Sequence, residues 1–388
     1  MGKVTELFFG LLRAALSGAD FKSTLSDSEW QQLYWIADRQ GLLGVCFQAI
    51  SRLPSEQQAP VEVRLQWWDD AENIRRLNQE QYEEAVRLTR LFTDAGRKSA
   101  VLKGQANARL YPDPLSRQPG DIDIWVEGGR ESVIALLLKL GLLDERPTQA
   151  TVGIAGKATA SYHHVHLPQT EQGVVVEVHF RPSSGNFYPL TNRRLQRWLE
   201  KEITDSTSFL ECPPNTKAGE FGVPSMPFAL VMQLAHVQHH LMSEGIGLRQ
   251  VVDYGILLQS ATDDDRRKVS ALLGRFGLRH SAGALMWVLD KVLHLDRGLL
   301  LCEPDEYRGR WMLHEILEGG NFGFHAERQQ QSLWRRFFAA RRRRFNLLRF
   351  DFHEALWVEL EYWKNFFWRI PIRIRLRTLS LRDIPRKV

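Results

Sequence analysis

Two aspartates spaced two apart are the strongest chemical signal in this chain. Asp121 and Asp123 alternate with isoleucines in "DIDIWV". A β-strand turns residues i and i+2 to one face, so the two carboxylates should share a face and repel unless a cation lies between them. A Val-rich segment, "VVVEVHF", places Glu177 on one face with His179. If that strand lies beside "DIDI", three carboxylates converge on one cluster.

Such a cluster suits a hard divalent cation, Mg²⁺ or Mn²⁺, which prefers oxygen ligands and often binds substrate phosphates as well. Two bridged ions can activate an attacking hydroxyl and neutralise a leaving pyrophosphate. Lys103 and Gly104 precede a short predicted helix, where they would offer positive charge and close backbone approach to a phosphate. Glu171 and His179 remain alternatives to Glu177 as the important residue of the second strand.

The elements that must position these residues form a mixed unit between helical segments. "SAVLKG" and "DIDIWV" predict strands, "GGRESVIALLLKLGLL" predicts a helix, and "ASYHHVHLP" with "GVVVEVHFR" predicts a hairpin. The flanking sequence shows helical periodicity, including a capping box from Ser26 to Glu29. The fold class predicted is α+β, a small α/β core flanked by N- and C-terminal helical regions. Its four segments are residues 1–97 (helical), 98–191 (core), 192–327 (helical) and 328–388 (basic and aromatic).

Composition excludes several classes of protein. The chain has 388 residues, 44% of them hydrophobic and 25% charged, as in an ordinary globular protein. Three distant cysteines, Cys46, Cys212 and Cys302, fit a reduced compartment rather than a disulfide framework. The N-terminal apolar stretch is interrupted by charges, and no uncharged run reaches the roughly 18 residues needed to span a bilayer. The sequence therefore predicts a soluble, cytoplasmic protein.

The positive charge is concentrated at the C-terminus. The net charge is +5, yet residues 328–388 hold 16 Lys or Arg against 5 Asp or Glu, a net +11 that leaves −6 for the remainder. In "RRFFAARRRRFNLLRF" and "WKNFFWRIPIRIRLR" arginines interleave with aromatics. This pattern is typical of nucleic-acid contact or of an anionic membrane surface, and also of a packed helix whose arginines reach water.

Other polar groups have simpler interpretations. In "HVQHH", His236 and His240 lie one helical turn apart beside His239, but the motif has no internal Glu, so packing or substrate contact is preferred to zinc binding. His164 and His166 share a strand face with Tyr162; this face could lie near the same cleft, but a solvated face is the preferred interpretation. The four-residue spacing of Arg249 and Asp253 predicts an ion pair within one helix.

The segments "LKG", "LYPDPLSRQPGDIDIWV" and "VVVEVHF" together resemble the uncharacterised nucleotidyltransferase family of the polymerase-β-like superfamily. The resemblance covers residues 98–190 well and the flanking helices, including "GLRQVVDYGILL", more loosely. It implies that Asp121, Asp123 and Glu177 bind the metal ions, and that Lys103, Gly104 and Arg117 line the nucleotide phosphates. The wider superfamily has Gly-Ser where this chain has Lys103-Gly104.

These observations leave three hypotheses for the function. The first is metal-dependent transfer of a nucleoside monophosphate from an NTP to a hydroxyl of an unknown acceptor, which could be a protein, a nucleic acid or a small molecule. The second is a nucleotide-sugar glycosyltransferase with an Asp-x-Asp metal site, although such an enzyme needs an α/β half before that motif and here predicted helices precede it. The third is a catalytically inactive binding protein with a nucleotidyltransferase fold, which the Lys103-Gly104 departure favours.

Overall fold

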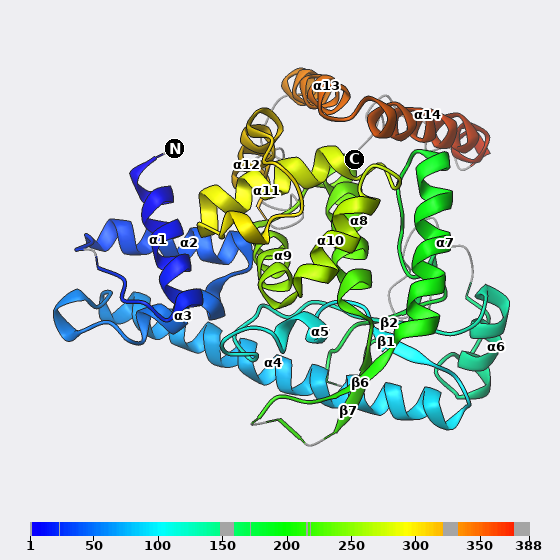
Figure 1. Cartoon of the computed structure of the whole chain (residues 1–388), viewed down its shortest axis with the longest axis horizontal. Coiled ribbons are helices and arrows are strands. Elements are labelled where there is room, and N and C mark those ends of the chain that lie inside the picture. Colours follow the sequence, from blue (N-terminus) through cyan, green and yellow to red (C-terminus); the bar gives the residue numbers. More distant parts are fainter. Residues whose placement is uncertain are drawn as a thin grey trace.

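A small mixed sheet lies between one long helix and a larger set of helices (Figure 1). The computed structural model describes residues 2–22, 24–147, 159–170, 172–214, 216–217, 219–320 and 333–375. The predicted fold class, α+β with a small α/β core flanked by helical regions, is confirmed.

The helices of the described residues are α1 (Lys3–Ser17), α2 (Asp27–Gln40), α3 (Leu43–Ile50), α4 (Val61–Asp94), α5 (Gln105–Ala108), α6 (Arg130–Lys139), α7 (Pro189–Ser206), α8 (Met226–Ser243), α9 (Leu248–Ser260), α10 (Asp263–Leu272), α11 (Arg279–Leu293), α12 (Glu306–Gly319), α13 (Leu333–Phe350) and α14 (Phe352–Arg375), with short 3-10 turns at Ser55–Gln57 and Arg297–Leu299. The strands are β1 (Ser99–Val101), β2 (Ile122–Val126), β3 (Thr159–Ala160), β4 (His164–His166), β5 (Val176–His179), β6 (Ser208–Glu211) and β7 (Glu220–Val223).

The main sheet has the strand order β1-β2-β5-β4-β3. Strand β2 runs antiparallel to β1 and parallel to β5, while β4 runs antiparallel to both β5 and β3. Helix α6 lies between β2 and the β4–β5 hairpin in the chain. This crossover returns the chain to the end of the sheet where β2 begins, so that β5 can run parallel to β2. The hairpin predicted from residues 160–181 is confirmed.

Two apolar cores hold these layers together. One lies under the sheet and joins Tyr82 and Phe92 of α4 to Ile124 of β2 and Val178 of β5. The other is shared by the N-terminal helices and by helices α7 to α12, and it also receives Phe350 from α13. Helix α4 contributes to both cores, which fixes the sheet relative to the helical regions.

Several local predictions are confirmed, and one is wrong. Ser26 and Glu29 form the capping box of α2, and the helix break near Gly245 separates α8 from α9. The prediction that residues 192–327 are helical is wrong at Ser208–Glu211 and Glu220–Val223, where β6 and β7 form a second, two-stranded sheet. Strand β6 is mostly exposed, so it lacks the apolar alternation by which a half-buried strand is recognised.

None of the helices in the described residues is long and apolar enough to cross a membrane.

Candidate functional site

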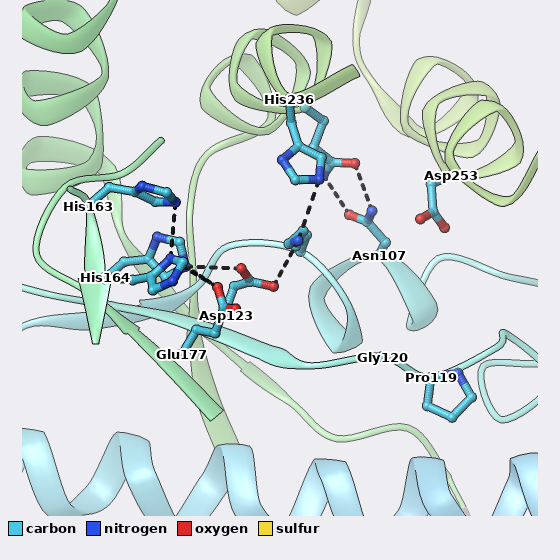
Figure 2. Close-up of polar contacts among 12 residues, drawn as sticks. Asn107, Pro119, Gly120, Asp123, His163, His164, Glu177, His236 and Asp253 are labelled. Atoms are coloured by element: carbon cyan, nitrogen blue, oxygen red, sulfur yellow. Dashed lines mark hydrogen bonds and ion pairs between the residues drawn. The ribbon is translucent and has the colours of Figure 1, made fainter. Parts of the chain in front are cut away.

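The sheet register brings the second carboxylate of "DIDI" beside the Glu of the hairpin. In the parallel pairing of β2 with β5, Asp123 lies opposite Glu177 and Trp125 lies opposite His179. Side chains at paired positions project from the same face of a sheet, so both acidic groups point toward the helices above it (Figure 2). The expectation that the Glu177 strand lies beside "DIDI" is confirmed.

Asp123 is buried between two cationic groups. Its Oδ2 lies 3.1 Å from Nζ of Lys103, and its Oδ1 lies 3.0 Å from Nε2 of His179. Although burial alone would raise the pKa of Asp123, Lys103 and His179 together hold it below its ordinary value. Burial alone would likewise lower the pKa of His179, but bonds to Asp123 and Glu177 raise it to about 9. Asp123 is therefore ionised and charge-balanced at neutral pH.

Lys103 carries a full positive charge in the same cluster. Burial favours its neutral form, but the carboxylates of Asp123, Asp121 and Glu177 outweigh burial and raise its pKa above the ordinary value. Its Nζ also lies 3.5 Å from Nε2 of His236. The sequence thus places a lysine where it neutralises the repelling carboxylates.

Glu177 is surrounded by imidazoles. Its Oε2 lies 3.0 Å from Nδ1 of His164 and 3.5 Å from Nε2 of His179, and its Oε1 lies 3.3 Å from Nδ1 of His166. Burial, with a smaller effect of the nearby aspartates, raises the pKa of Glu177. The carboxylate is thus partly desolvated, and it shares the cationic His179 with Asp123.

Asp121 and Gly104 lie at the edge of this cluster. Asp121 precedes β2 and is half-buried, and the close donor groups found among the described residues contain Asp123 and Glu177 but not Asp121. Gly104 has φ +66°, a conformation that favours glycine, and a Cβ there would lie 3.6 Å from the carbonyl oxygen of Asp121. Helix α5, the short helix predicted after Gly104, has four residues.

Arg117 lies apart from the carboxylates and is paired with Asp253 of α9. Its Nε and Nη2 donate to the two oxygens of Asp253 at 2.7 Å each, and both side chains are buried. Tyr111 donates a further bond to Asp253 at 2.7 Å. Figure 2 shows Asp253 on the far side of Asn107 from Asp123 and Glu177. The contact of Arg117 with phosphates stays a prediction.

Asp253 thus has a partner that helical spacing does not indicate. Arg249, four residues before it, donates from Nη1 to the carbonyl oxygens of Gln118 and Pro119 at 3.3 and 3.4 Å. Two arginines therefore join α9 to the loop before "DIDI". Arg249 of α9 donates to the loop, and Arg117 of the loop donates to Asp253 of α9.

Buried amides of α4 fix the same loop from below. Asn78 donates to the carbonyl oxygens of Leu115 at 2.9 Å and Arg117 at 2.8 Å, and Gln81 donates to that of Gly120. Gln105 donates to the side-chain oxygens of Asn78 and Gln81. Buried backbone carbonyls need such partners, so the Pro-rich loop is rigidly placed and delivers Asp121 and Asp123 to β2.

The histidines of α8 have separate partners rather than a common ligand site. His236 faces Lys103, His239 shares a bond of 2.9 Å with the carbonyl oxygen of Gly185, and His240 lies 3.3 Å from Glu244. None of the close donor groups found among the described residues includes these three histidines. Asn107 and Gln233 exchange two bonds of 2.8 Å and fix α5 against α8.

The hairpin histidines belong to the cluster, which was the alternative to the preferred sequence interpretation. The prediction of a solvated face holds for Tyr162 but is wrong for His164, which is buried. The antiparallel register places His164 opposite His179 and His166 opposite Glu177. The signal available in the sequence was four histidines within 17 residues of one hairpin. Glu171, the alternative to Glu177, lies outside the described residues.

The donors around Asp123 fit a divalent cation. One ligand atom each from Asp123, Glu177 and His179 lies within 4.8 Å of the others. Asp123 Oδ2 is buried, and despite its charge pairing with Lys103 it accepts no hydrogen bond of regular geometry among the described residues. A distinct cavity of about 450 Å³ lies elsewhere, between α1, α3 and the loop from Tyr111 to Ser116.

A family of sequences and a solved structure are similar to this chain. The sequence model of a family described as "Uncharacterised nucleotidyltransferase" matches residues 26–294. No curated protein matches the chain. Among solved structures, an antigenic nucleotidyltransferase-like protein from Paracoccidioides brasiliensis is similar at 12% identity and a TM-score of 0.34, with 62% of this chain and 98% of that chain covered.

Proposed function

The chain belongs to the uncharacterised nucleotidyltransferase family, and on that premise we propose that it transfers a nucleoside monophosphate from an NTP to a hydroxyl of an acceptor. The resemblance read from "LKG", "DIDIWV" and "VVVEVHF" is confirmed at the level of the family. The observation that carries the proposal is the pairing of Asp123 with Glu177 across β2 and β5, beside Lys103.

In this proposal the acidic residues hold the divalent cation, Mg²⁺ or Mn²⁺. Asp123 and Glu177 supply oxygens from adjacent strands, and Asp121 supplies a third from the half-buried start of β2. When bound there, the ion would offset the charge of the triphosphate and lower the pKa of the acceptor hydroxyl. Phosphoryl chemistry needs mainly position and charge, both of which this cluster offers.

Lys103 and Gly104 are proposed to contact the nucleotide phosphates. Lys103 has to leave Asp123 Oδ2 to reach a phosphate, and the arriving cation would replace its charge at that oxygen. Gly104, with no Cβ, lets the backbone approach the phosphate closely. Arg117 is proposed to act on the phosphates through the loop it anchors on Asp253, unless nucleotide binding frees its guanidinium.

A nucleic acid is one acceptor class that the C-terminal helices favour. Helices α13 and α14 lie together along one edge of the molecule (Figure 1). They expose Phe345, Trp368 and the guanidinium of Arg342, a combination that can pair with phosphates and stack on bases. We propose this surface as the contact with a nucleic-acid acceptor.

The second candidate function is nucleotide binding without transfer. Both oxygens of Asp123 already have cationic partners, Lys103 and His179, which would compete with a divalent ion. Family membership favours nucleotide transfer and nucleotide binding without transfer over the glycosyltransferase hypothesis.

The experiment is to incubate the full chain with each α-labelled NTP, Mg²⁺ or Mn²⁺, and cell lysate, and to identify the labelled macromolecule. Asp123→Asn should lose labelling by at least about a hundredfold, as expected when a group that stabilises the transition state is removed. Asp69→Asn, an exposed carboxylate of α4, is the matched control and should label like the parent. Calorimetric binding of NTP with no labelled product would establish the binding protein, and an active Asp123→Asn variant would refute the site.

A further inference from the structure

The imidazoles around Glu177 form a second donor group beside the one that contains Asp123. His164 and His166 are two apart on β4, and Glu177 lies directly opposite His166 on β5. The strand period and this register turn all three side chains to one face. Three paired positions define the register of β4 against β5, so the sheet itself brings these side chains together.

The spacing of the donor atoms suits one metal ion. Nδ1 of His164 lies 3.0 Å from Oε2 of Glu177 and Nδ1 of His166 lies 3.3 Å from Oε1, so these two nitrogens lie at such spacings from the carboxylate. Two ligands of a tetrahedral zinc ion lie about 3.3 Å apart, given bond lengths of about 2.0–2.1 Å. One ligand atom from each of the three residues lies within 4.8 Å of the others.

The carboxylate of Glu177 also favours a cation. Among the described residues, the ion-pair partners of Glu177 are all imidazoles. Glu177 shares the charge of His179 with Asp123, so a divalent ion bound by His164 and His166 would supply further positive charge beside this carboxylate.

The cluster extends beyond these three residues and is open to solvent on one side. His179 also belongs, with His163 and His164, to a third close group of donors. The side chain of His166 is 41% exposed and gives an ion a route from solvent.

We infer that His164, His166 and Glu177 bind a transition-metal ion of the zinc type, beside Asp123 and with Glu177 shared between this site and the proposed transfer site. Imidazole nitrogen is a ligand of choice for Zn²⁺ and its first-row neighbours, whereas Mg²⁺ prefers oxygen and keeps its water. The inference does not depend on nucleotide transfer, because the three residues form the site whether or not a nucleotide binds.

The test measures zinc directly on the tag-free full chain. After treatment with a chelator, the protein is titrated with Zn²⁺ against a chromophoric chelator in excess Mg²⁺, and with Co²⁺ while visible absorption is recorded. We expect one equivalent of Zn²⁺ per chain, not displaced by millimolar Mg²⁺, and a Co²⁺ spectrum of tetrahedral type.

Variants assign the ion to its ligands. His166→Gln and His164→Gln should each weaken Zn²⁺ binding by more than about tenfold, while His314→Gln, an exposed imidazole of α12, should bind like the parent. Circular dichroism verifies that each variant is folded, and His166→Gln, at a half-exposed position, provides the decisive case if His164→Gln unfolds.

Three outcomes would overturn the inference. They are a folded parent that binds no Zn²⁺, a folded His166→Gln variant with parental affinity, and an Asp123→Asn variant that loses Zn²⁺ as completely as His166→Gln, which would assign the ion to the Asp123 group. Failure of the transfer assay with zinc binding intact would refute only the proposed function.

Discussion

Nζ of Lys103 lies 3.1 Å from Oδ2 of Asp123, the oxygen that the proposed divalent ion needs. In the proposed function a lysine and a metal ion compete for one carboxylate, and the phosphates of the nucleotide would favour the metal ion there by attracting the lysine. In the absence of nucleotide the ion pair balances the charge of a buried aspartate.

Lys103→Met should separate nucleotide binding from metal binding. Loss of a charge-assisted hydrogen bond of roughly 1.5–3 kcal/mol predicts NTP affinity about ten- to a hundredfold weaker. Divalent-ion affinity without nucleotide should be equal to the parent's or higher, because the competing cation is gone. Calorimetry with Mn²⁺ alone and then with NTP measures both. Metal affinity that falls as much as NTP affinity would contradict the competition.

Arg117 and Asp253 should depend on each other for stability. Removing one partner of a buried, doubly bonded ion pair leaves an uncompensated charge, so Arg117→Met and Asp253→Asn should each lower the free energy of unfolding by about 3–5 kcal/mol. The combined variant should lose clearly less than the sum. Urea unfolding measures this. Arg76→Ala, which removes an exposed pair with Glu80, is the control and should cost under about 1 kcal/mol. Additive losses would show that the pair is not coupled.

Glu354 should make stability depend on pH. Burial raises its pKa to about 7 although backbone N–H groups of Phe187 and Tyr188 favour the charged form. Because the folded state holds the proton more tightly than the unfolded chain, this group's stabilisation is present below about pH 4.5 and is lost as pH rises through about 7.

Glu354→Gln keeps an acceptor for the backbone bonds and removes the titration. Thermal melting from pH 5 to 8 should show the variant gaining on the parent as pH rises, by roughly 2–3 kcal/mol in total. Histidines that titrate in the same range are common to both proteins and cancel in the difference. A constant difference between the two melting curves would show that Glu354 does not titrate in this range.

The C-terminal surface should bind nucleic acid through exposed groups. Truncation is a poor test, because Leu347 and Phe350 of α13 are buried in the core. Phe345→Ser with Trp368→Ser should weaken single-strand binding by roughly 1–3 kcal/mol per stacked base. Arg342→Gln should reduce the salt dependence by about one counterion. Tyr307→Ser, an equally exposed aromatic of α12, is the control. Fluorescence anisotropy over a salt series measures these effects, and salt-independent affinity would point to packing or another partner.

The sequence by itself determined which side chains share a face. The two-residue period of "VVVEVHF" puts Glu177 with His179, and that of "DIDIWV" predicts the same for Asp121 and Asp123, since strand geometry depends only on neighbouring residues. The capping box of α2 and the helix break near Gly245 are likewise local, and they were predicted for that reason.

Only the tertiary structure decided which of these faces meet. The partner of Arg117 is 136 positions away, and Asn78 of α4, which donates to the carbonyl oxygen of Arg117, is 39 positions away. Neither contact can be recognised from the spacing of neighbouring residues. The burial of His164 is also invisible in the sequence, because its strand pattern is that of a solvated face. Only the register of β4 against β5 places it beside His179 and Glu177. Burial and register arise from contacts between distant segments, and these convert a run of histidines and acids into one charged cluster.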